Sequence, residues 1–590
     1  MTTTTRPGIF QPNILTLAIA IGIAAPAQAI TFNIGEIEGQ FDSSLSIGAS
    51  WAVRNADPEL VGTTNGGKAF ASTGDDGRLN FKKGETFSKI FKGIHDLELR
   101  YGDTGVFTRG KYWYDFELKD EHRLFKEISD SNRKEGAKSS GAQILDAFVY
   151  HNYQLGDLPG SVRLGKQVVS WGESTFIGNS INSINPIDVA AFRRPGAEIK
   201  EGLIPVNMFY VSQSLTENLS AEAFYQLEWD QTVVDNCGTF FGSDVIADGC
   251  DNNLTLGNRA QVAALSPLAG PMGVTIVPEG LILPRGADDD ARDQGQWGMA
   301  LRWLGDDTEY GAYFINYHSR NPYYAGRTAN AADITLASNL PFGGIPGAVG
   351  PTSLLGNGQY FVDYPEDIQL YGLSFATTLP SGTAWNGEIS YRPNMPLQIH
   401  TGDVTGNVAS DVVKAFLSGG MPGALAAADQ EVEHYRRKEV TQAQTTLTHL
   451  FSSVLGADRL VVVGELGLTR IGGLEHRSEV RYGRATEFAP FPADRHGFFT
   501  STSWGYRARG VLEYNNVLAG INLKPNLAWA HDVDGYGPVF NEGAKAVSLG
   551  LDADYANTYT ASLSYTDFFG GDYNTAIDRD FVALSFGVNF

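Results

Sequence analysis

The sequence predicts an all-β fold, a transmembrane up-and-down antiparallel β-barrel of about 18 strands, with about 16 or about 20 strands as the alternatives. Three features support this fold: apolar residues alternate with polar ones, very short connections alternate with long ones, and the last strand is apolar on one face. We expect short periplasmic turns, long extracellular loops, and some loops folded into the lumen.

Alternation with a period of two marks strands along most of the chain. In 41–53 the odd positions are mostly apolar, and in 106–118 and 219–230 one face is mostly apolar while the other carries charge. A soluble sandwich also alternates, but it seldom needs so many successive strands that end in aromatic residues. If the apolar faces meet lipid, the polar faces line a lumen, where we expect Arg109, Lys111, Asp115, Glu117, Glu222, Gln226, Glu228, Asp230, Asn386, Glu388, Ser390, Arg392, Arg507, Arg509 and Glu513.

The lengths of the connections distinguish a barrel from a sandwich. Nearly every second link is very short, as at 102–104, 216–218 and 515–516, while the others reach about sixty residues. Short turns at one end and long loops at the other are typical of an outer-membrane barrel. The predicted strands are 41–53, 94–101, 106–118, 143–155, 161–169, 207–215, 219–230, 297–304, 309–318, 367–379, 384–393, 440–451, 459–470, 503–514, 517–530, 546–553, 556–567 and 581–590.

The last ten residues form an amphipathic strand that ends on an aromatic residue. A buried terminal strand of a soluble protein is the alternative. The pattern resembles the signal by which the bacterial outer-membrane assembly machinery recognises its clients, so we expect that machinery to be a partner. The residues of this signal are Val582, Leu584, Phe586, Val588 and Phe590.

The N-terminus predicts export. Arg6, a short apolar run at 14–25 and the small residues of Ala27-Gln28-Ala29 are typical of a cleaved signal peptide over residues 1–29. Residues 30–590 then form a single barrel domain in the cell outer membrane, with its lipid as a partner. The net charge of −23 argues against nucleic acid, whose phosphates require Lys and Arg.

No cofactor or metal is expected. Cys237 and Cys250 are the two cysteines, and in an oxidising compartment we expect them to form one disulfide. The acidic run 288–293 is more typical of an exposed loop than of a cation site. The chain has no nucleophile elbow, P-loop or zinc-protease motif, and His318 and His434 are isolated, so we predict no enzyme.

The connection after the strand at 161–169 is the main candidate for a functional site. It is rich in Asn, Ile and Pro, and it carries charges of both signs. We expect it to fold inward and constrict the lumen. A loop packed on the barrel wall with internal ion pairs is the alternative. The lumen could also be filled by the loops 231–296, 319–366 and 394–439, the last of which contains a predicted helix within 406–431 that would plug or cap the barrel. The candidate constriction residues are Trp171, Glu173, Arg193, Arg194, Glu198 and Glu201.

Several segments in order resemble one known family. They are "RLGKQVVSWGEST", "INPIDV", "RRPGAEIKEGLIPVNM", "GQWGMALRW", "YHSRNP", "DYPEDIQLYGLSFATTL" and "GEISYRPNMPLQI". Together they resemble the proteobacterial outer-membrane barrels catalogued as domain of unknown function 1302. The resemblance implies movement of a hydrophobic or bulky compound, with periplasmic or inner-membrane transport partners.

We therefore predict an outer-membrane channel or transport protein that passes a small or hydrophobic compound. The alternatives are an outer-membrane enzyme acting on lipid or polymer, and a structural or adhesive barrel.

Overall fold

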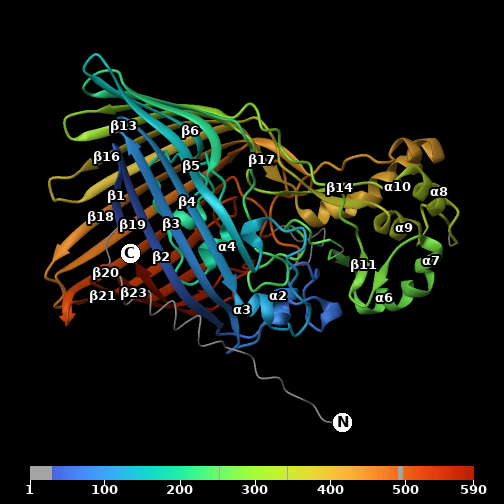
Figure 1. Cartoon of the computed structure of the whole chain (residues 1–590). Coiled ribbons are helices and arrows are strands. Elements are labelled where there is room, and N and C mark those ends of the chain that lie inside the picture. The colour runs from blue at the N-terminus through green and yellow to red at the C-terminus, as the bar shows by residue number, and fades with distance from the viewer. Residues whose placement is uncertain (1–29, 252, 342, 348, 489–495) are drawn as a thin grey trace, which may run out of the picture.

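The computed structural model describes residues 30–590 except 252, 342, 348 and 489–495, so the predicted signal peptide lies outside the described residues. Eighteen antiparallel strands form a closed barrel, because β2 pairs with β3 on one side and with the last strand, β24, on the other (Figure 1). The short β1 (Ile30–Ile34) adds a hairpin to the start of β2. The barrel strands are β2 (Ile37–Ala52), β3 (Thr86–Tyr101), β4 (Thr104–Asp115), β5 (Ser140–Leu155), β6 (Leu158–Gln167), β7 (Val206–Ser214), β8 (Leu219–Gln226), β12 (Trp297–Leu304), β13 (Thr308–Tyr317), β16 (Ile368–Thr378), β17 (Ala384–Gln398), β18 (Tyr435–Ser452), β19 (Arg459–Gly472), β20 (Thr502–Leu518), β21 (Ile521–Asp534), β22 (Lys545–Tyr555), β23 (Tyr559–Phe569) and β24 (Phe581–Asn589).

The predicted strand number is confirmed, and several predicted strand ends are wrong, two of which change the residues that line the lumen. β4 stops at Asp115, whose carboxylate accepts hydrogen bonds from the backbone N–H groups of Glu117 and Leu118 and so begins helix α3 (Phe116–Asp120). Glu117 is therefore helical. β8 stops at Gln226, which leaves Glu228 and Asp230 in the next loop rather than on the lumen wall.

The outer face of the barrel is apolar. Leu466, Leu549 and Phe586 point outward and are about half exposed on the isolated chain, while their neighbours along each strand face inward. A sheet in lipid pairs all its backbone groups only when it is closed. The hydrocarbon core of the membrane covers an apolar belt of this kind. The chain is an outer-membrane β-barrel. Among the described residues, no helix is long and apolar enough to cross a membrane.

The two ends of the barrel differ in their connections, as predicted. The end that holds the C-terminus has tight turns, and the other end has the long loops (Figure 1). The loops contain the helices α2 (Asp76–Asn80), α3, α4 (Val189–Arg193), α5 (Ile199–Gly202), α6 (Arg259–Leu265), α7 (Ala269–Met272), α8 (Ala331–Ser338), α9 (Gly350–Gly356) and α10 (Thr401–Ala426), and the short strands β9 (Thr255–Leu256), β10 (Ile276–Val277), β11 (Gly280–Ile282), β14 (Tyr323–Arg327) and β15 (Gln359–Asp363).

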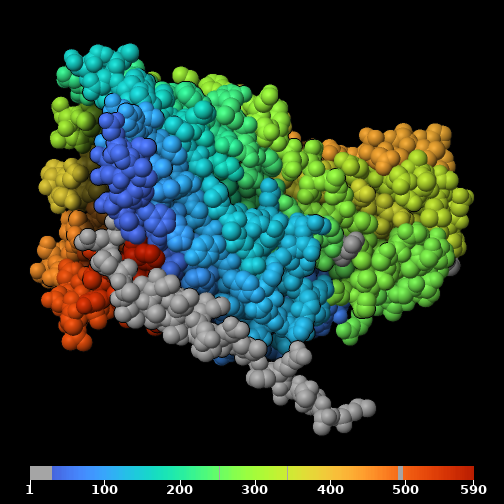
Figure 2. All heavy atoms as spheres, in the orientation of Figure 1, coloured from blue at the N-terminus to red at the C-terminus, as the bar shows by residue number. Residues whose placement is uncertain are grey.

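A helical lobe projects from the long-loop end, as Figures 1 and 2 show in green to orange. Its core contains Met272, Ile334, Leu354 and Val412, all fully buried. The helix predicted within 406–431 is confirmed as part of α10, which bends at Gly420, where φ is 61°. α10 packs on α8, α9 and β14 within the lobe, so it does not plug the lumen as the sequence suggested.

The predicted disulfide between Cys237 and Cys250 is present. It closes a loop at the base of the lobe. Arg285 binds the same loop through the carbonyl oxygens of Val245 and Ala247. This part of the lobe is thus fixed by one covalent bond and by a guanidinium group.

Because neighbouring residues of β22 face lipid and lumen in turn, two adjacent substitutions should change the free energy of unfolding by different amounts. Leu549→Arg places a charge in lipid near the middle of the strand and should lower the free energy of unfolding by about 2–4 kcal/mol. Ser548→Arg faces the lumen and should change it by less than about 1 kcal/mol. Urea titrations of the protein in lipid vesicles measure both, and equal losses would contradict the assigned register.

Candidate functional site

The connection between β6 and β7, residues 168–205, lies inside the barrel; we call it the inner loop. Figure 1 shows its helix α4 within the ring of strands. The inner loop bonds to side chains on opposite walls, among them Glu222 on β8, Glu465 on β19 and Ser44 on β2. The position of the inner loop agrees with the prediction that this connection folds into the lumen.

Trp171 begins the first arm of the inner loop. It is 1% exposed, its indole N–H donates to Glu222 Oε2 at 2.6 Å, and its ring packs against Phe224 and Tyr313. Gly172 follows with a φ of 89°, and a Cβ there would lie 2.4 Å from a carboxylate oxygen of Glu388. The Trp-Gly pair therefore turns the chain away from the strand and toward the opposite wall.

Two buried carboxylates hold the tip of this arm. Glu465, 2% exposed, accepts hydrogen bonds from the backbone N–H groups of Thr175, Phe176 and Ile177 at 2.6–2.9 Å. Glu388 accepts hydrogen bonds from the N–H groups of Glu173 and Ile181. A carboxylate that receives several N–H groups is well satisfied without a cation. The walls of β17 and β19 thus fix the backbone of the loop.

Arg392 holds the returning part of the same arm through two backbone carbonyl oxygens, of Asn179 and Ser180, and the hydroxyl of Ser183. It is fully buried and donates to the oxygens of Asn179, Ser180 and Ser183 at 2.8–3.0 Å. Gln442 adds a bond to the carbonyl of Gly178 at 2.8 Å. In one short segment of the loop, carboxylates of the wall thus bind the backbone N–H groups. The guanidinium of Arg392 and the amide of Gln442 bind backbone C=O groups of the same segment.

The second arm, 186–205, lies against β2, β3, β4 and β24. Lys111 pairs with Asp188 at 2.9 Å, and Lys92 pairs with Glu201 and also donates to the carbonyl of Gly196. Both ion pairs are buried. Pro195 covers Gly48 closely enough that a Cβ there would lie 2.8 Å from the proline ring. This arm is tied to the wall as firmly as the first.

The charged residues predicted for a constriction ring are mostly engaged in such contacts. Glu201 is in the buried pair with Lys92, and Glu198 accepts a hydrogen bond from Ser44 at 3.0 Å. Arg193 pairs with Asp235, and Arg194 donates to the carbonyl of Gly136 and stacks on Trp113. These four charges bind the wall and neighbouring loops rather than form an open ring.

Most of the predicted lumen-facing residues of the strands do face inward, and Glu117, Glu228 and Asp230 are the exceptions because they lie outside the strands. Arg109 pairs with Asp96 and Asp146, Asp115 accepts from Ser88 at 2.6 Å, and Arg507 pairs with Asp532. Arg509 differs, because it is exposed and has no hydrogen bond or ion pair with any described residue. The sequence analysis did not select Glu465, Gln442 and Gln444. Their alternate positions on β18 and β19 place them on the inward face, and this signal could have identified them.

The inner loop covers most of the lumen wall and leaves the part formed by β20–β23 open. The inward side chains on β13–β19 are buried under it, including Ile315, Leu370, Ser390, Gln442 and Thr469. Across β20–β23, Arg509, Ala528, Ser548 and Thr566 lie opposite one another in a row, and none of the four is buried. Phe176 at the tip of the loop faces this wall across a cavity of about 150 Å³.

A larger cavity, of about 1190 Å³, lies on the lobe side of the inner loop. We call it the vestibule. Its walls come from five segments, 63–78, 240–265, 401–406, 483–487 and 575–579, together with Arg193 of the inner loop and residues of β10, β11 and α9. The vestibule thus lies between parts of the lobe and the inner loop.

Three buried aspartates beside the vestibule are the group among the described residues whose geometry could hold a metal ion. One carboxylate oxygen each of Asp75, Asp76 and Asp244 lies within 4.8 Å of the others. Lys126 pairs with Asp76 at 2.9 Å and shares its charge with Glu279. Burial raises the pKa of Asp75 to about 6 and the pKa of Asp244 well above its usual range.

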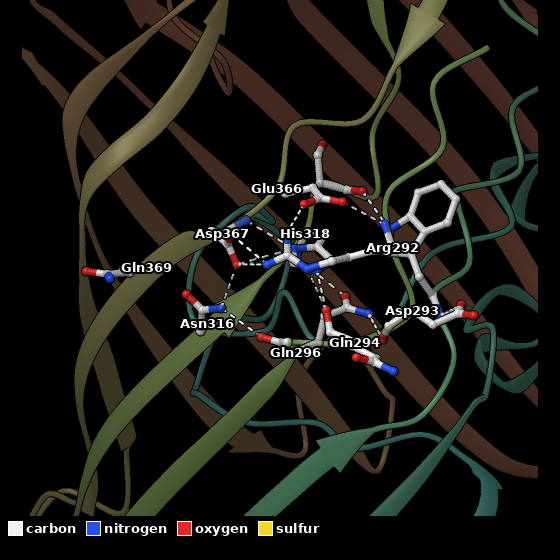
Figure 3. A network of polar contacts seen from close by, with 12 residues as sticks. Arg292, Asp293, Gln294, Gln296, Asn316, His318, Glu366, Asp367 and Gln369 are labelled. Carbon is white, nitrogen blue, oxygen red and sulfur yellow. Dashed lines mark hydrogen bonds and ion pairs between the residues drawn. The ribbon is translucent and has the colours of Figure 1, made fainter. Parts of the chain in front are cut away.

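A further polar network joins three of the segments that resemble the known family. Figure 3 shows Arg292 between Glu366 and Asp367, both of which it binds. The His318 ring accepts a hydrogen bond from the backbone of Asp367 at Nδ1 and donates one to the carbonyl of Gln294 at Nε2, at 3.0 and 2.8 Å. His318 thus fastens a loop to the ends of β13 and β16.

The raised pKa values predict that the contact between 62–80 and 238–246 weakens with rising pH. The native state binds more protons than the unfolded state between the ordinary aspartate pKa and about 6, so its stability falls as pH rises through that window. Hydrogen exchange at 238–246, corrected for the intrinsic rate, should be slower at pH 4.5 than at pH 7.5. Asp75→Asn should reduce this difference and Asp306→Asn, in a turn at the other end, should not; the same pH dependence in both variants would contradict the assignment.

Comparison with known proteins gives distant structural matches along almost the entire chain. No curated protein matches the sequence. OccAB1 of Acinetobacter baumannii is 10% identical with a TM-score of 0.39, over 96% of this chain and 98% of that one. OccD3 (OpdP) of Pseudomonas aeruginosa is 10% identical with a TM-score of 0.36, over 97% and 95%. The outer membrane channel DcaP of A. baumannii is 8% identical with a TM-score of 0.34, over 95% and 100%.

The family comparison covers the whole barrel. The model of the family described as "Protein of unknown function (DUF1302)" matches residues 12–590. The resemblance expected from the sequence segments is thereby confirmed. The chain belongs to this family, DUF1302.

Proposed function

We propose that the protein is an outer-membrane channel in which the inner loop narrows the lumen to a passage along β20–β23. One observation carries this proposal: the loop is bound to the walls on either side of β20–β23, while the row from Arg509 to Thr566 stays uncovered. Barrels of this strand number are wide enough to leave an aqueous channel. A loop fixed on one side therefore leaves space on the other.

The wall of the passage suits solutes that are not highly charged. Ala528, Ser548 and Thr566 are small, so they add width without adding fixed charge. Arg509 is a cation on this wall whose side chain has no partner among the described residues, and Phe176 faces it from the loop. This pairing of a ring with a guanidinium supports a small or hydrophobic compound as the solute, with a preference for anionic over cationic groups.

Planar-bilayer recording of the purified protein tests the channel. Wild type should give discrete conductance steps. The double variant Glu388→Gln, Glu465→Gln should give steps at least about two-fold larger, because an amide donor opposes the backbone N–H groups that hold the loop. Glu98→Gln, on β3, whose carboxylate accepts a hydrogen bond from Tyr150 rather than from the loop, is the matched control and should leave the steps unchanged. The absence of conductance in both the wild type and the double variant would reject the proposal.

Arg509 should set the charge preference of the passage. Arg509→Glu replaces this cation with an anion, so the ratio of anion to cation permeability should fall several-fold in a salt gradient. Arg437→Glu changes a cation on the outer part of β18 that binds the carbonyls of Asn394 and Glu366, and it should not alter the ratio. An unchanged reversal potential in Arg509→Glu would exclude a passage along β20.

A further inference from the structure

The vestibule is large and its lining is mostly apolar. Ligand sites for small molecules have volumes of about 300–1,000 Å³, and the vestibule, at about 1190 Å³, is somewhat larger. Its apolar lining includes Phe70, Phe241, Ile246, Leu256, Val262 and Leu281. These side chains come from loops far apart in the sequence, so they form a composite surface rather than the core of one loop.

Four cations on the vestibule wall have acidic partners. Lys68 pairs with Glu59 at 2.7 Å, and Arg193 pairs with Asp235. Arg78 and Arg579 both bind Asp578. Arg78 and Arg579 share this one carboxylate, and the charge of Arg78 also acts on Glu487, so the wall as a whole offers little net attraction to an anionic ligand.

Glu487 is one of the polar groups on this wall whose side chain has no partner in another described residue. Its side chain has no hydrogen bond or ion pair with any described residue, while its backbone carbonyl accepts a hydrogen bond from Phe70 at 2.9 Å. Gly74 makes room for the carboxyl group, because a Cβ there would lie 2.7 Å from Glu487 Oε1. Burial raises the pKa of Glu487. The backbone therefore fixes one unpaired hydrogen-bonding group on an apolar wall.

We propose that the vestibule captures an uncharged apolar molecule that carries a hydroxyl group, with the apolar body against Phe70 and Phe241 and the hydroxyl on Glu487. A hydroxyl both donates and accepts, so it fits the carboxyl group whether that group is protonated or ionised. An ammonium would also meet Glu487, but its transfer into an apolar cavity costs much more than that of a hydroxyl. The inference rests on the channel proposed above, for which the vestibule supplies the solute class and the place of capture.

The glycines of α10 allow a direct test of the cavity. Gly406 lines the vestibule and Gly419 does not, and an added Cβ meets nothing within 4 Å at either position. Gly406→Trp should therefore fill the cavity without a clash, and Gly419→Trp is the matched control on the same helix. The protein is placed in lipid nanodiscs and titrated with the fluorescent alcohol 1-pyrenemethanol and with its methyl ether, and empty nanodiscs are subtracted.

Wild type should bind both probes saturably, and the alcohol about five-fold more tightly than the ether, as expected for one net hydrogen bond. Glu487→Leu should bind the two probes equally. Gly406→Trp should lower affinity for both at least ten-fold, while Gly419→Trp should match wild type. Equal binding of alcohol and ether by wild type, or unchanged binding by Gly406→Trp, would overturn the proposal.

The same titration separates this inference from the channel itself. Probe binding without conductance would retain the capture site and reject the channel. Conductance without saturable binding would retain the channel and reject the capture site.

Discussion

The bonds between the buried carboxylates of Glu388 and Glu465 and the backbone of the inner loop are the interaction on which the rest of the lumen depends. An ionised carboxylate inside a protein is costly unless hydrogen bonds replace its water. Here the loop supplies N–H groups from Glu173, Thr175, Phe176, Ile177 and Ile181. The carboxylates of the wall and the N–H groups of the loop therefore satisfy each other's hydrogen bonds. Either set would be costly to bury without the other.

This mutual satisfaction explains why the lumen is asymmetric. The walls that carry buried charge, β3, β4, β17 and β19, hold the two arms of the loop through Lys92, Lys111, Glu388 and Glu465. On the wall between them, Ala528 and Ser548 face the tip of the loop, and neither side chain is bonded to the loop. The distribution of charge around the barrel thus decides where the loop lies and where space is left.

Much of the barrel could be predicted from sequence, because a strand in lipid must alternate and must pair. The eighteen strands, their inward residues such as Glu388, Arg392 and Arg507, and the disulfide follow from period-two patterns, link lengths and cysteine count. The sequence predicted too long a β4, because the alternation of apolar and polar residues continues past Asp115. The change from strand to helix there depends on the capping side chain of Asp115 alone.

The functional features depend on contacts that no local pattern encodes. The role of Glu465 arises from three N–H groups almost 290 residues away in sequence. The charges near Pro195 suggested an open ring, but ion pairs and hydrogen bonds to other strands and loops hold them against the wall. The vestibule likewise joins Phe70, Phe241, Gly406 and Glu487 from four separate segments.

Cysteine accessibility during bilayer recording tests the central claim most directly. The native cysteines are joined in the disulfide, so an introduced thiol reacts alone. Ser548→Cys lies on the uncovered wall, and a charged, membrane-impermeant thiol reagent should modify it and reduce the conductance. Ser390→Cys lies beneath the inner loop, bonded to Ser180 in the native chain, and should stay unmodified with full conductance. Equal rates of modification at the two positions would contradict a loop fixed against one wall.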